Sequence, residues 1–169
     1  MGCLILPGVK LTFLPPFLVD SVYFSFFFLL FFKKSYLLYA KIEAEGAIAL
    51  AEALKHNTHL KSLWVDGNKI GEKGGKAIGE ALAYNENLEV LGMSSCEIGG
   101  AGGRALGKSL QKNHVLVQLA IGGNDVRPKT EHTIMESVKA NKEAKHRREY
   151  QEWLKTQQDA EESSRKDEL

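Results

Sequence analysis

Three segments of the chain repeat one pattern at an interval of 28 residues. They begin at Leu60, Leu88 and Leu116 and read LKSLWVDGNKIG, LEVLGMSSCEIG and LVQLAIGGNDVR. Each has leucine at its first and fourth places and an apolar residue at its sixth and eleventh. A fixed period of about 20 to 50 residues is typical of stacked repeats, in which each unit buries its apolar face only against its neighbours. This period therefore constrains the fold more than any other feature of the chain.

The first half of each repeat has the pattern of a short strand followed by a turn. Its apolar fourth and sixth places alternate with period two, as in a strand that has one buried face. The ninth place is filled by Asn68, Cys96 and Asn124. An asparagine amide can bond the backbone groups that a sharp turn leaves unpaired. We therefore predict that this row is buried and maintains the turn.

The second half of each repeat has the pattern of an amphipathic helix. The segments that start at Gly74 and Gly102 read GGKAIGEALAYN and GGRALGKSLQKN. Their apolar residues fall on one helical face and their charged residues on the other. Asn85 and Asn113 end these segments, at a position where a helix C-terminus tolerates left-handed backbone. The sequence thus predicts alternating strands and helices, with an asparagine at the C-terminus of each helix.

This pattern resembles the ribonuclease-inhibitor-like class of leucine-rich repeat, which also occurs in NOD-like receptors and Ran GTPase-activating proteins. The resemblance implies an α/β fold, a short solenoid with parallel strands on its concave face and helices on its convex face. It covers residues 41–141. It is specific for the fold and not for a function, because the class serves many unrelated partners.

The repeats are predicted to occupy residues 41–141, as about three and a half units. Residues 41–57 match the helix half of an earlier unit. Residues 32–40 fit the preceding strand half poorly, because Phe32 and Ser35 stand where the pattern has leucine. The sequence therefore predicts that repeat character is lost before residue 41.

Beyond the third strand, one more helix is expected to complete the array. Pro128 suits its first turn, and Asn141 occupies the place of the earlier helix-end asparagines. Residues 142–169 are strongly charged and predict a polar C-terminal helix. Its one apolar turn, around Tyr150 and Trp153, is expected either to pack against the last repeat or to stay solvated in a partly frayed tail.

Residues 1–40 form a separate apolar segment with several interpretations. Residues 11–32 are almost entirely apolar but contain Asp20 and two adjacent prolines. A cleaved signal peptide is one hypothesis, and an uncleaved anchor is another, so membrane association would run through residues 11–32. The remaining hypotheses are an apolar cap on the repeats, or an artefact of the gene sequence such as a wrong start or a retained intron.

The last four residues, Lys166, Asp167, Glu168 and Leu169, spell a retrieval signal of the endoplasmic reticulum. This signal works only if the tail lies in the lumen, where a cleaved signal peptide would place it. Lys33 and its neighbour Lys34 would instead hold the C-terminal side of an uncleaved anchor in the cytosol. The expected location is therefore the lumen of the endoplasmic reticulum after cleavage, and the cytoplasm or a membrane otherwise.

The composition gives no indication of a catalytic or metal site. A net charge of +1 argues against a dedicated nucleic-acid partner or a strongly acidic partner, and two cysteines, Cys3 and Cys96, cannot form a disulfide framework. His56 and His59 lack a third metal ligand nearby. The glycines within residues 99–103 lack the Lys-Ser/Thr ending of a phosphate-binding loop. We predict no enzymatic activity, no metal and no cofactor.

The remaining candidate surface is the concave face of the predicted sheet. Its outward strand positions, which are our candidate partner-binding residues, are Ser62, Trp64, Asp66, Val90, Gly92, Ser94, Gln118 and Ala120. Trp64 beside Gly92 would place a large aromatic ring next to an open hollow. Aromatic anchors of this kind dominate protein interfaces. Alternatively, Trp64 packs against the N-terminal segment as part of a cap.

Two functional hypotheses follow. The first is a non-catalytic module that binds a protein partner of unknown identity through the concave face. The second is a regulator of a small GTPase, since Ran GTPase-activating proteins share the repeat class. That resemblance implies a catalytic arginine in an early repeat, which has no counterpart here, so Arg104 is only the most plausible arginine to test. The acidic block expected after the repeats is also absent.

Overall fold

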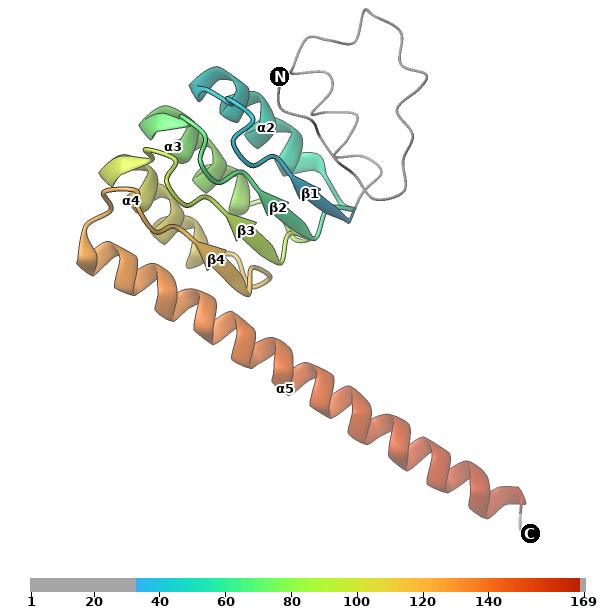
Figure 1. Cartoon of the computed structure of the whole chain (residues 1–169). Helices are drawn as coiled ribbons and strands as arrows, with labels where there is room; N and C mark the ends of the chain where they lie inside the picture. Colours follow the sequence, from blue (N-terminus) through green and yellow to red (C-terminus); the bar gives the residue numbers. More distant parts are fainter. Residues whose placement is uncertain (1–32, 168–169) are drawn as a thin grey trace, which may run out of the picture.

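The computed structural model describes the backbone of residues 33–167 and the side chains of residues 33–160. In this part of the chain, strands and helices alternate, and Figure 1 shows the strands side by side with α2, α3 and α4 stacked behind them. The elements are β1 (Lys34–Tyr36), α2 (Ala44–His56), β2 (Ser62–Trp64), α3 (Gly71–Leu82), β3 (Val90–Gly92), α4 (Gly99–Leu110), β4 (Gln118–Ala120) and α5 (Pro128–Asp167).

The sheet has the order β1-β2-β3-β4, and every neighbouring pair is parallel. Its register reproduces the sequence period, because Leu63 pairs with Leu91 and Leu91 with Leu119. Each strand has only three residues, so the sheet depends on the layers behind it for stability. The predicted α/β leucine-rich-repeat solenoid is confirmed.

The core is a set of aliphatic rows between the sheet and the helices. Leu63 and Leu91 lie under the sheet, and Leu54, Ile78 and Leu106 reach them from the helices, all fully shielded from solvent. Truncation of such a side chain to alanine costs about 2 to 5 kcal/mol, because a cavity adds to the lost transfer free energy.

The repeats begin earlier than the sequence pattern predicts. β1 pairs with β2 one period further on, so one strand in the repeat register precedes the predicted boundary at residue 41. Ser35 takes the place of Leu63 and is buried, although its hydroxyl has no hydrogen-bond partner among the described residues. The strand forms because pairing uses only backbone groups, and Leu37 still supplies one buried apolar side chain.

The interpretations of the apolar N-terminal segment, including membrane association through residues 11–32, concern residues 1–32 and lie outside the described part of the chain. Within that part, none of the helices combines the length and the apolar character that a membrane span requires. Of the proposed retrieval signal, Glu168 and Leu169 lie outside it too, and nothing is described of the side chains of Lys166 and Asp167.

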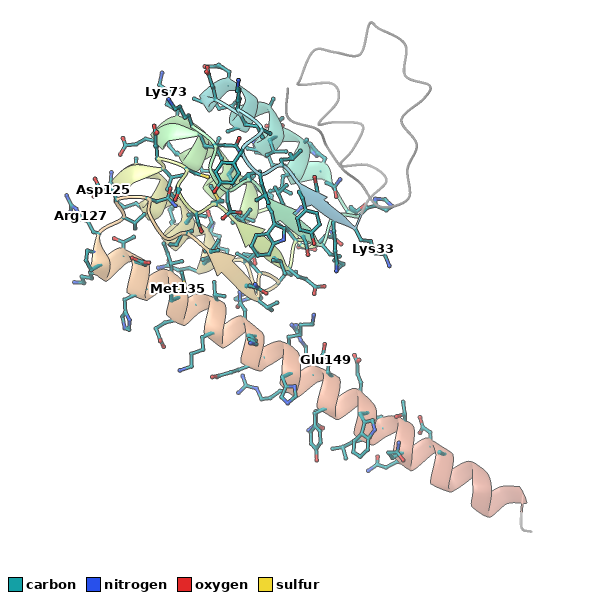
Figure 2. All side chains as sticks on the ribbon, viewed as in Figure 1. Lys33, Lys73, Asp125, Arg127, Met135 and Glu149 are labelled. Atoms are coloured by element: carbon teal, nitrogen blue, oxygen red, sulfur yellow. The ribbon has the colours of Figure 1, made fainter. Side chains whose placement is uncertain are left out.

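The helix of the last repeat and the polar C-terminal helix are one element. α5 starts at Pro128, as expected, and continues through Asn141 without a break. Ile134 and Val138 are buried against the last repeat, whereas the second half of the helix leaves the solenoid (Figure 1). Up to residue 160, the side chains of this half lie apart from the repeats (Figure 2). The predicted domain boundary at residue 141 is therefore not a structural break.

The aromatic pair on this helix does not pack against the last repeat. Tyr150 is 53% exposed and Trp153 is 54% exposed. Their rings stack on each other, with centroids 6.0 Å apart. Of the two expected alternatives, the structure supports the one in which this turn is solvated. The segment is helical, however, and not a frayed tail.

Asparagines form a ladder at the turns that follow the strands. The Asn68 amide donates to the carbonyls of Val65, at 2.6 Å, and of Leu37 in the preceding repeat, at 2.8 Å. Asn124, one repeat after Cys96, makes the equivalent bonds to the carbonyls of Met93 and Ile121. The Cys96 thiol substitutes for the amide and donates to the Val65 carbonyl at 3.2 Å. The predicted role of this row in maintaining the turn is confirmed.

A second ladder of asparagines lies at the ends of the helices, and its backbone is not left-handed. Asn57 has a φ of −80°, and neither Asn85 nor Asn113 is among the described residues with positive φ. The Asn85 amide instead donates to the carbonyls of Leu54 and Asn57 in the preceding repeat. Its oxygen accepts from backbone N–H groups at the start of the next loop. The asparagines are required for their side chains and not for left-handed backbone.

Candidate protein-binding surface

The sheet presents one face away from α2, α3 and α4, and we call this side the sheet face. The strand register aligns its side chains in rows across the four repeats. The first row is Lys34, Ser62, Val90 and Gln118. The second row is Tyr36, Trp64, Gly92 and Ala120. A third row, just beyond the strands, is Leu38, Asp66, Ser94 and Gly122.

All eight candidate residues therefore fall in these rows, as the sequence predicted. Their exposure differs, because Ser62 and Gly92 are buried whereas Gln118 is exposed. Their role in binding a partner stays a prediction, since the arrangement by itself brings them together without identifying what they contact.

Trp64 fills the space that the sequence predicted to be hollow. A Cβ built on Gly92 would overlap both the Trp64 ring and the Asp66 carboxylate, so the indole covers Gly92. Trp64 is consequently half-buried. Glycine is required at this position because the ring approaches the neighbouring backbone directly. Of the N-terminal segment, the described part begins at residue 33, and there Tyr36 pairs with Trp64 in the strand register. A contact of Trp64 with residues 1–32 lies outside the described residues.

Asp66 lies beside this ring in an unusual environment. Its Oδ1 accepts a hydrogen bond from the Ser94 N–H at 2.7 Å. Its Oδ2 is shielded from solvent and has no donor among the described residues. Burial and, after it, the negative charge of Asp66 raise the pKa of the Cys96 thiol below the turn. A shielded carboxylate oxygen without a donor costs free energy, and such groups call for an explanation.

Three exposed apolar residues at the β1 end of the sheet were missed by the sequence analysis. Tyr36 is 52% exposed, Leu38 is 46% exposed and Tyr39 is 77% exposed. Tyr36 pairs with Trp64 in the register, and the Tyr39 ring covers Gly67. We call Tyr36, Leu38, Tyr39 and Trp64 the aromatic patch. The sequence does contain a signal for this strand, because Tyr36 lies 28 residues before Trp64. The signal is hard to recognise because Ser35 stands where the pattern has leucine.

The other candidate groups do not converge. No three metal-ligating side chains gather anywhere in the described part of the chain. His59 contacts Thr58, and His56 faces Glu52. Arg104 is exposed on α4, among the helices and away from the sheet face.

Comparison with known proteins identifies the repeat. The model of the leucine-rich-repeat family matches residues 56–79 and 84–107. No curated protein matches the sequence. The chain is similar in structure to actin-binding site 2 of leiomodin-1, with a TM-score of 0.67 and 16% identity over 85% of this chain and 99% of that one.

It is also similar to the C-terminal domain of tropomodulin from Caenorhabditis elegans. The TM-score is 0.50 and the identity 14%, over 76% of this chain and 98% of that one. At such identities the likeness concerns the fold. The repeat pattern, the matched family model and the stacked strand–helix units together show that this chain has the leucine-rich-repeat fold.

Proposed function

We propose that this protein is a non-catalytic interaction module that binds a protein partner through its sheet face. The observation that carries the proposal is the aromatic patch, where large apolar side chains stay exposed on a rigid sheet. Exposed aromatic clusters mark protein-binding sites, and aromatic anchors supply most of the binding free energy of an interface.

Asp66 supports the same location for the binding site. Its unpartnered oxygen lies next to the Trp64 ring, so a small movement of the indole would open it to a donor from a partner. The bond formed would be charge-assisted, which is stronger than a bond between neutral groups. The patch and this carboxylate together combine an apolar anchor with a polar group that gives orientation.

Actin is the first partner to test. Leiomodin-1 contributes its actin-binding site 2 through a domain of similar fold. The likeness is in the fold, so actin is a candidate that needs direct measurement.

The experiment compares two tryptophan variants of the full chain. Trp64→Ala removes the anchor, and Trp153→Ala is the matched control, because Trp153 is the second of the two tryptophans and lies on α5. Binding to purified actin is measured by co-sedimentation and by fluorescence titration, and partners from cell extract are quantified by mass spectrometry. We expect Trp64→Ala to weaken partner binding by about 10-fold or more, as for an anchor worth about 2 kcal/mol.

Tyr36→Ala provides a second test that leaves the sheet packing intact, because the Tyr36 side chain is half exposed. Circular dichroism checks that each variant is folded. Partners retained equally by wild type, Trp64→Ala and Tyr36→Ala would contradict the proposal. Loss with Trp153→Ala alone would assign binding to α5 instead.

The alternative, regulation of a small GTPase through Arg104, receives no support from the comparisons. It would require accelerated GTP hydrolysis that Arg104→Ala abolishes. A hydrolysis rate unchanged by the added protein would eliminate it.

A further inference from the structure

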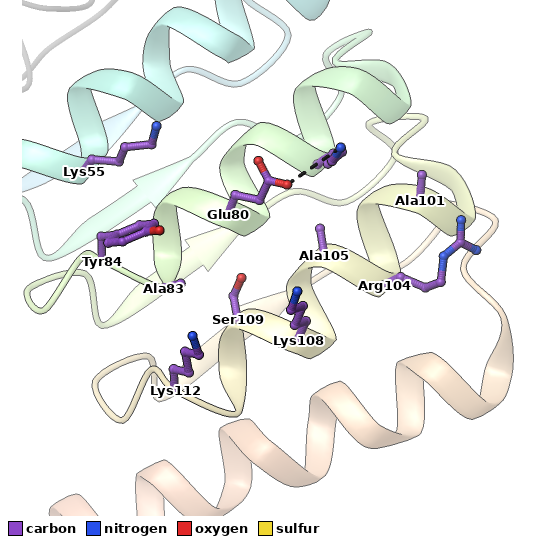
Figure 3. A pocket seen from close by; sticks show the side chains of 11 residues that line it. Lys55, Glu80, Ala83, Tyr84, Ala101, Arg104, Ala105, Lys108, Ser109 and Lys112 are labelled. Carbon is purple, nitrogen blue, oxygen red and sulfur yellow. Dashed lines mark ion pairs between the residues drawn. The ribbon is translucent and has the colours of Figure 1, made fainter.

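A groove of about 700 Å³ lies between α3 and α4, on the helical side of the molecule. Figure 3 shows Ala83, Ala101 and Ala105 lining it between the two helices. Tyr84, which is 70% exposed, lies at the end of α3 beside it. The groove therefore has apolar surface along its length and one exposed aromatic ring. It is separate from the sheet face.

The charges that line this groove are strongly unbalanced. Its lining contains Lys55, Lys76, Arg104, Lys108 and Lys112 against one carboxylate.

Two of these cations are compensated by neighbouring carboxylates. Lys76 pairs with Glu80 at 3.8 Å, and Lys55 pairs with Glu52 at 2.7 Å. The Glu52 carboxylate also raises the pKa of Lys55 through its hydrogen bond, against a smaller effect of burial.

The other three cations have no carboxylate within ion-pair distance among the described side chains. Arg104, Lys108 and Lys112 follow one another at intervals of four residues, so they form a row along α4 and the turn after it. The row extends about 12 Å, since a helix rises about 1.5 Å per residue.

This row is particular to one repeat. One period earlier, Glu80 stands in the place of Lys108, and one period before that the residue is Glu52. The chain contains no Asp or Glu at all between Glu97 and Asp125. Like charges four residues apart on a helix repel each other, whereas Lys108 in the last turn interacts favourably with the helix dipole. The stability of α4 therefore accounts for Lys108 but not for the whole row.

The shape and charge of the groove fit a polypeptide with carboxylates at regular intervals. Side chains four residues apart in a helix, or two apart in a strand, lie about 6 to 7 Å from each other. That spacing matches the spacing of the three cations. Arg104 can receive a carboxylate with two parallel hydrogen bonds. The alanines and Tyr84 provide the apolar contact that a polypeptide, unlike a free anion, would use.

We propose that the groove between α3 and α4 binds an acidic segment of a partner protein. Its carboxylates lie opposite Arg104, Lys108 and Lys112, and an apolar side chain packs against Tyr84. This surface is independent of the sheet face, so the two sites can be tested separately.

The test uses a fluorescein-labelled helical peptide that has glutamate at every fourth position and one phenylalanine. The control peptide has glutamine in place of each glutamate. Binding to the full chain is measured by fluorescence anisotropy at low and at physiological salt. We expect the glutamate peptide to bind at least 10-fold more tightly than the glutamine peptide, with a difference that shrinks as salt rises.

Two triple variants with the same change in charge locate the site. The groove variant carries Arg104→Glu, Lys108→Glu and Lys112→Glu. The control variant carries Lys69→Glu, Lys73→Glu and Lys129→Glu, which are exposed lysines outside the groove. We expect at least a 10-fold loss in the groove variant and a change below twofold in the control variant. Tyr84→Ala is expected to weaken binding about threefold without changing its dependence on salt.

Several outcomes would overturn the proposal. An equal loss in both triple variants would mean that only the net charge matters. Phosphatidylserine vesicles and a single-stranded oligonucleotide are tested as competing ligands. If either binds more tightly than the peptide and loses this binding in the groove variant, the row belongs to a different class of partner. Thermal unfolding checks that the groove variant is folded, because it replaces a row of three positive charges by a row of three negative charges, which also repel each other. If it is not folded, Lys108→Glu alone replaces it. Trp64→Ala is expected to bind the peptide normally, which separates this proposal from the sheet-face proposal.

Discussion

The Asn113 side chain connects three neighbouring segments of the repeats. Its amide donates to the carbonyls of Leu82 and Asn85, at 2.8 and 2.9 Å. Its oxygen accepts from the N–H groups of Val115 and Leu116, at 3.0 and 2.8 Å. The terminal carbonyls of a helix have no partner within the helix, and here the next repeat supplies one. One buried side chain thus satisfies four backbone groups.

Replacement of Asn113 by alanine is expected to lower the free energy of unfolding by about 2 to 4 kcal/mol, because buried backbone groups would lose their partners. Urea unfolding followed by circular dichroism measures the change. Asn87→Ala serves as the control, since Asn87 is only half-buried, and is expected to change the free energy by less than about 0.5 kcal/mol. Equal effects of the two substitutions would contradict this role for the ladder.

The position of this residue was predictable from the sequence, but its role was not. The recurrence of Asn57, Asn85, Asn113 and Asn141 identifies a helix end. An asparagine there can either adopt left-handed backbone or donate its amide to a distant carbonyl. Only the stacked neighbouring repeat decides between the two, since it brings the acceptors within reach.

At the scale of the elements, one carboxylate links α5 to the repeats in addition to the packing of Ile134 and Val138. Glu89, just before β3, accepts a hydrogen bond from Lys145 of α5 at 2.6 Å and pairs with Lys61 at 3.2 Å. The Lys145 hydrogen bond holds the pKa of Glu89 below its ordinary value of 4.5, although burial opposes this shift. Because the folded pKa is lower than the unfolded pKa, the pair stabilises the fold above the unfolded pKa. This stabilisation is lost as the pH falls through the folded pKa.

Glu89→Gln is expected to lower the stability at neutral pH by up to about 1 kcal/mol, as for a partly exposed ion pair. The difference in melting temperature between wild type and variant should be largest near pH 7. It should shrink as the pH falls below about 4.5, the ordinary pKa of the carboxyl group. Glu86→Gln, at an exposed position in the same loop, is the control. A difference that persists unchanged in acid would show that the charge of Glu89 is not responsible.

Most elements were predictable because the period aligns each one with two others. Helices α3 and α4, strands β2 to β4 and the start of α5 at Pro128 all follow from the pattern. β1 was not predictable, because Ser35 replaces the leucine by which the other strands are recognised. The unbroken α5 was missed for a different reason, since a change in composition at residue 141 does not interrupt backbone hydrogen bonding.

At the scale of the whole molecule, the part of the candidate site that the sequence pattern does not predict lies in the first repeat. The sequence pattern assigns eight residues to the sheet face. It does not assign Tyr36, Leu38 and Tyr39, because these residues precede the predicted start of the repeats at residue 41. The filled space beside Gly92 was also unpredictable, because the direction of the Trp64 ring depends on side-chain packing and not on the period. Periodicity assigns a residue to a face of the sheet, whereas the side-chain rotamers determine which groups on that face are exposed.

We also propose that the last four residues retain the protein in the endoplasmic reticulum. Deletion of Lys166 through Leu169 from the full chain is then expected to release it into the culture medium, as measured by immunoblotting of cells and medium. Adding two alanines after Leu169 should have the same effect, because this signal is read only at the extreme C-terminus. A chain that remains in the cytosolic or membrane fraction in all three forms would favour the cytoplasmic or anchored hypothesis instead.

The length of α5 has a consequence for how many molecules the protein can hold at once. From residue 142 to Asp167 the helix extends about 39 Å at about 1.5 Å per residue, which is more than the diameter of a small domain. A receptor that recognises the end of the chain would therefore be kept several nanometres from the sheet and from the helical groove. A partner bound at the sheet face would therefore leave the end of α5 accessible, so the helix has the geometry of a spacer.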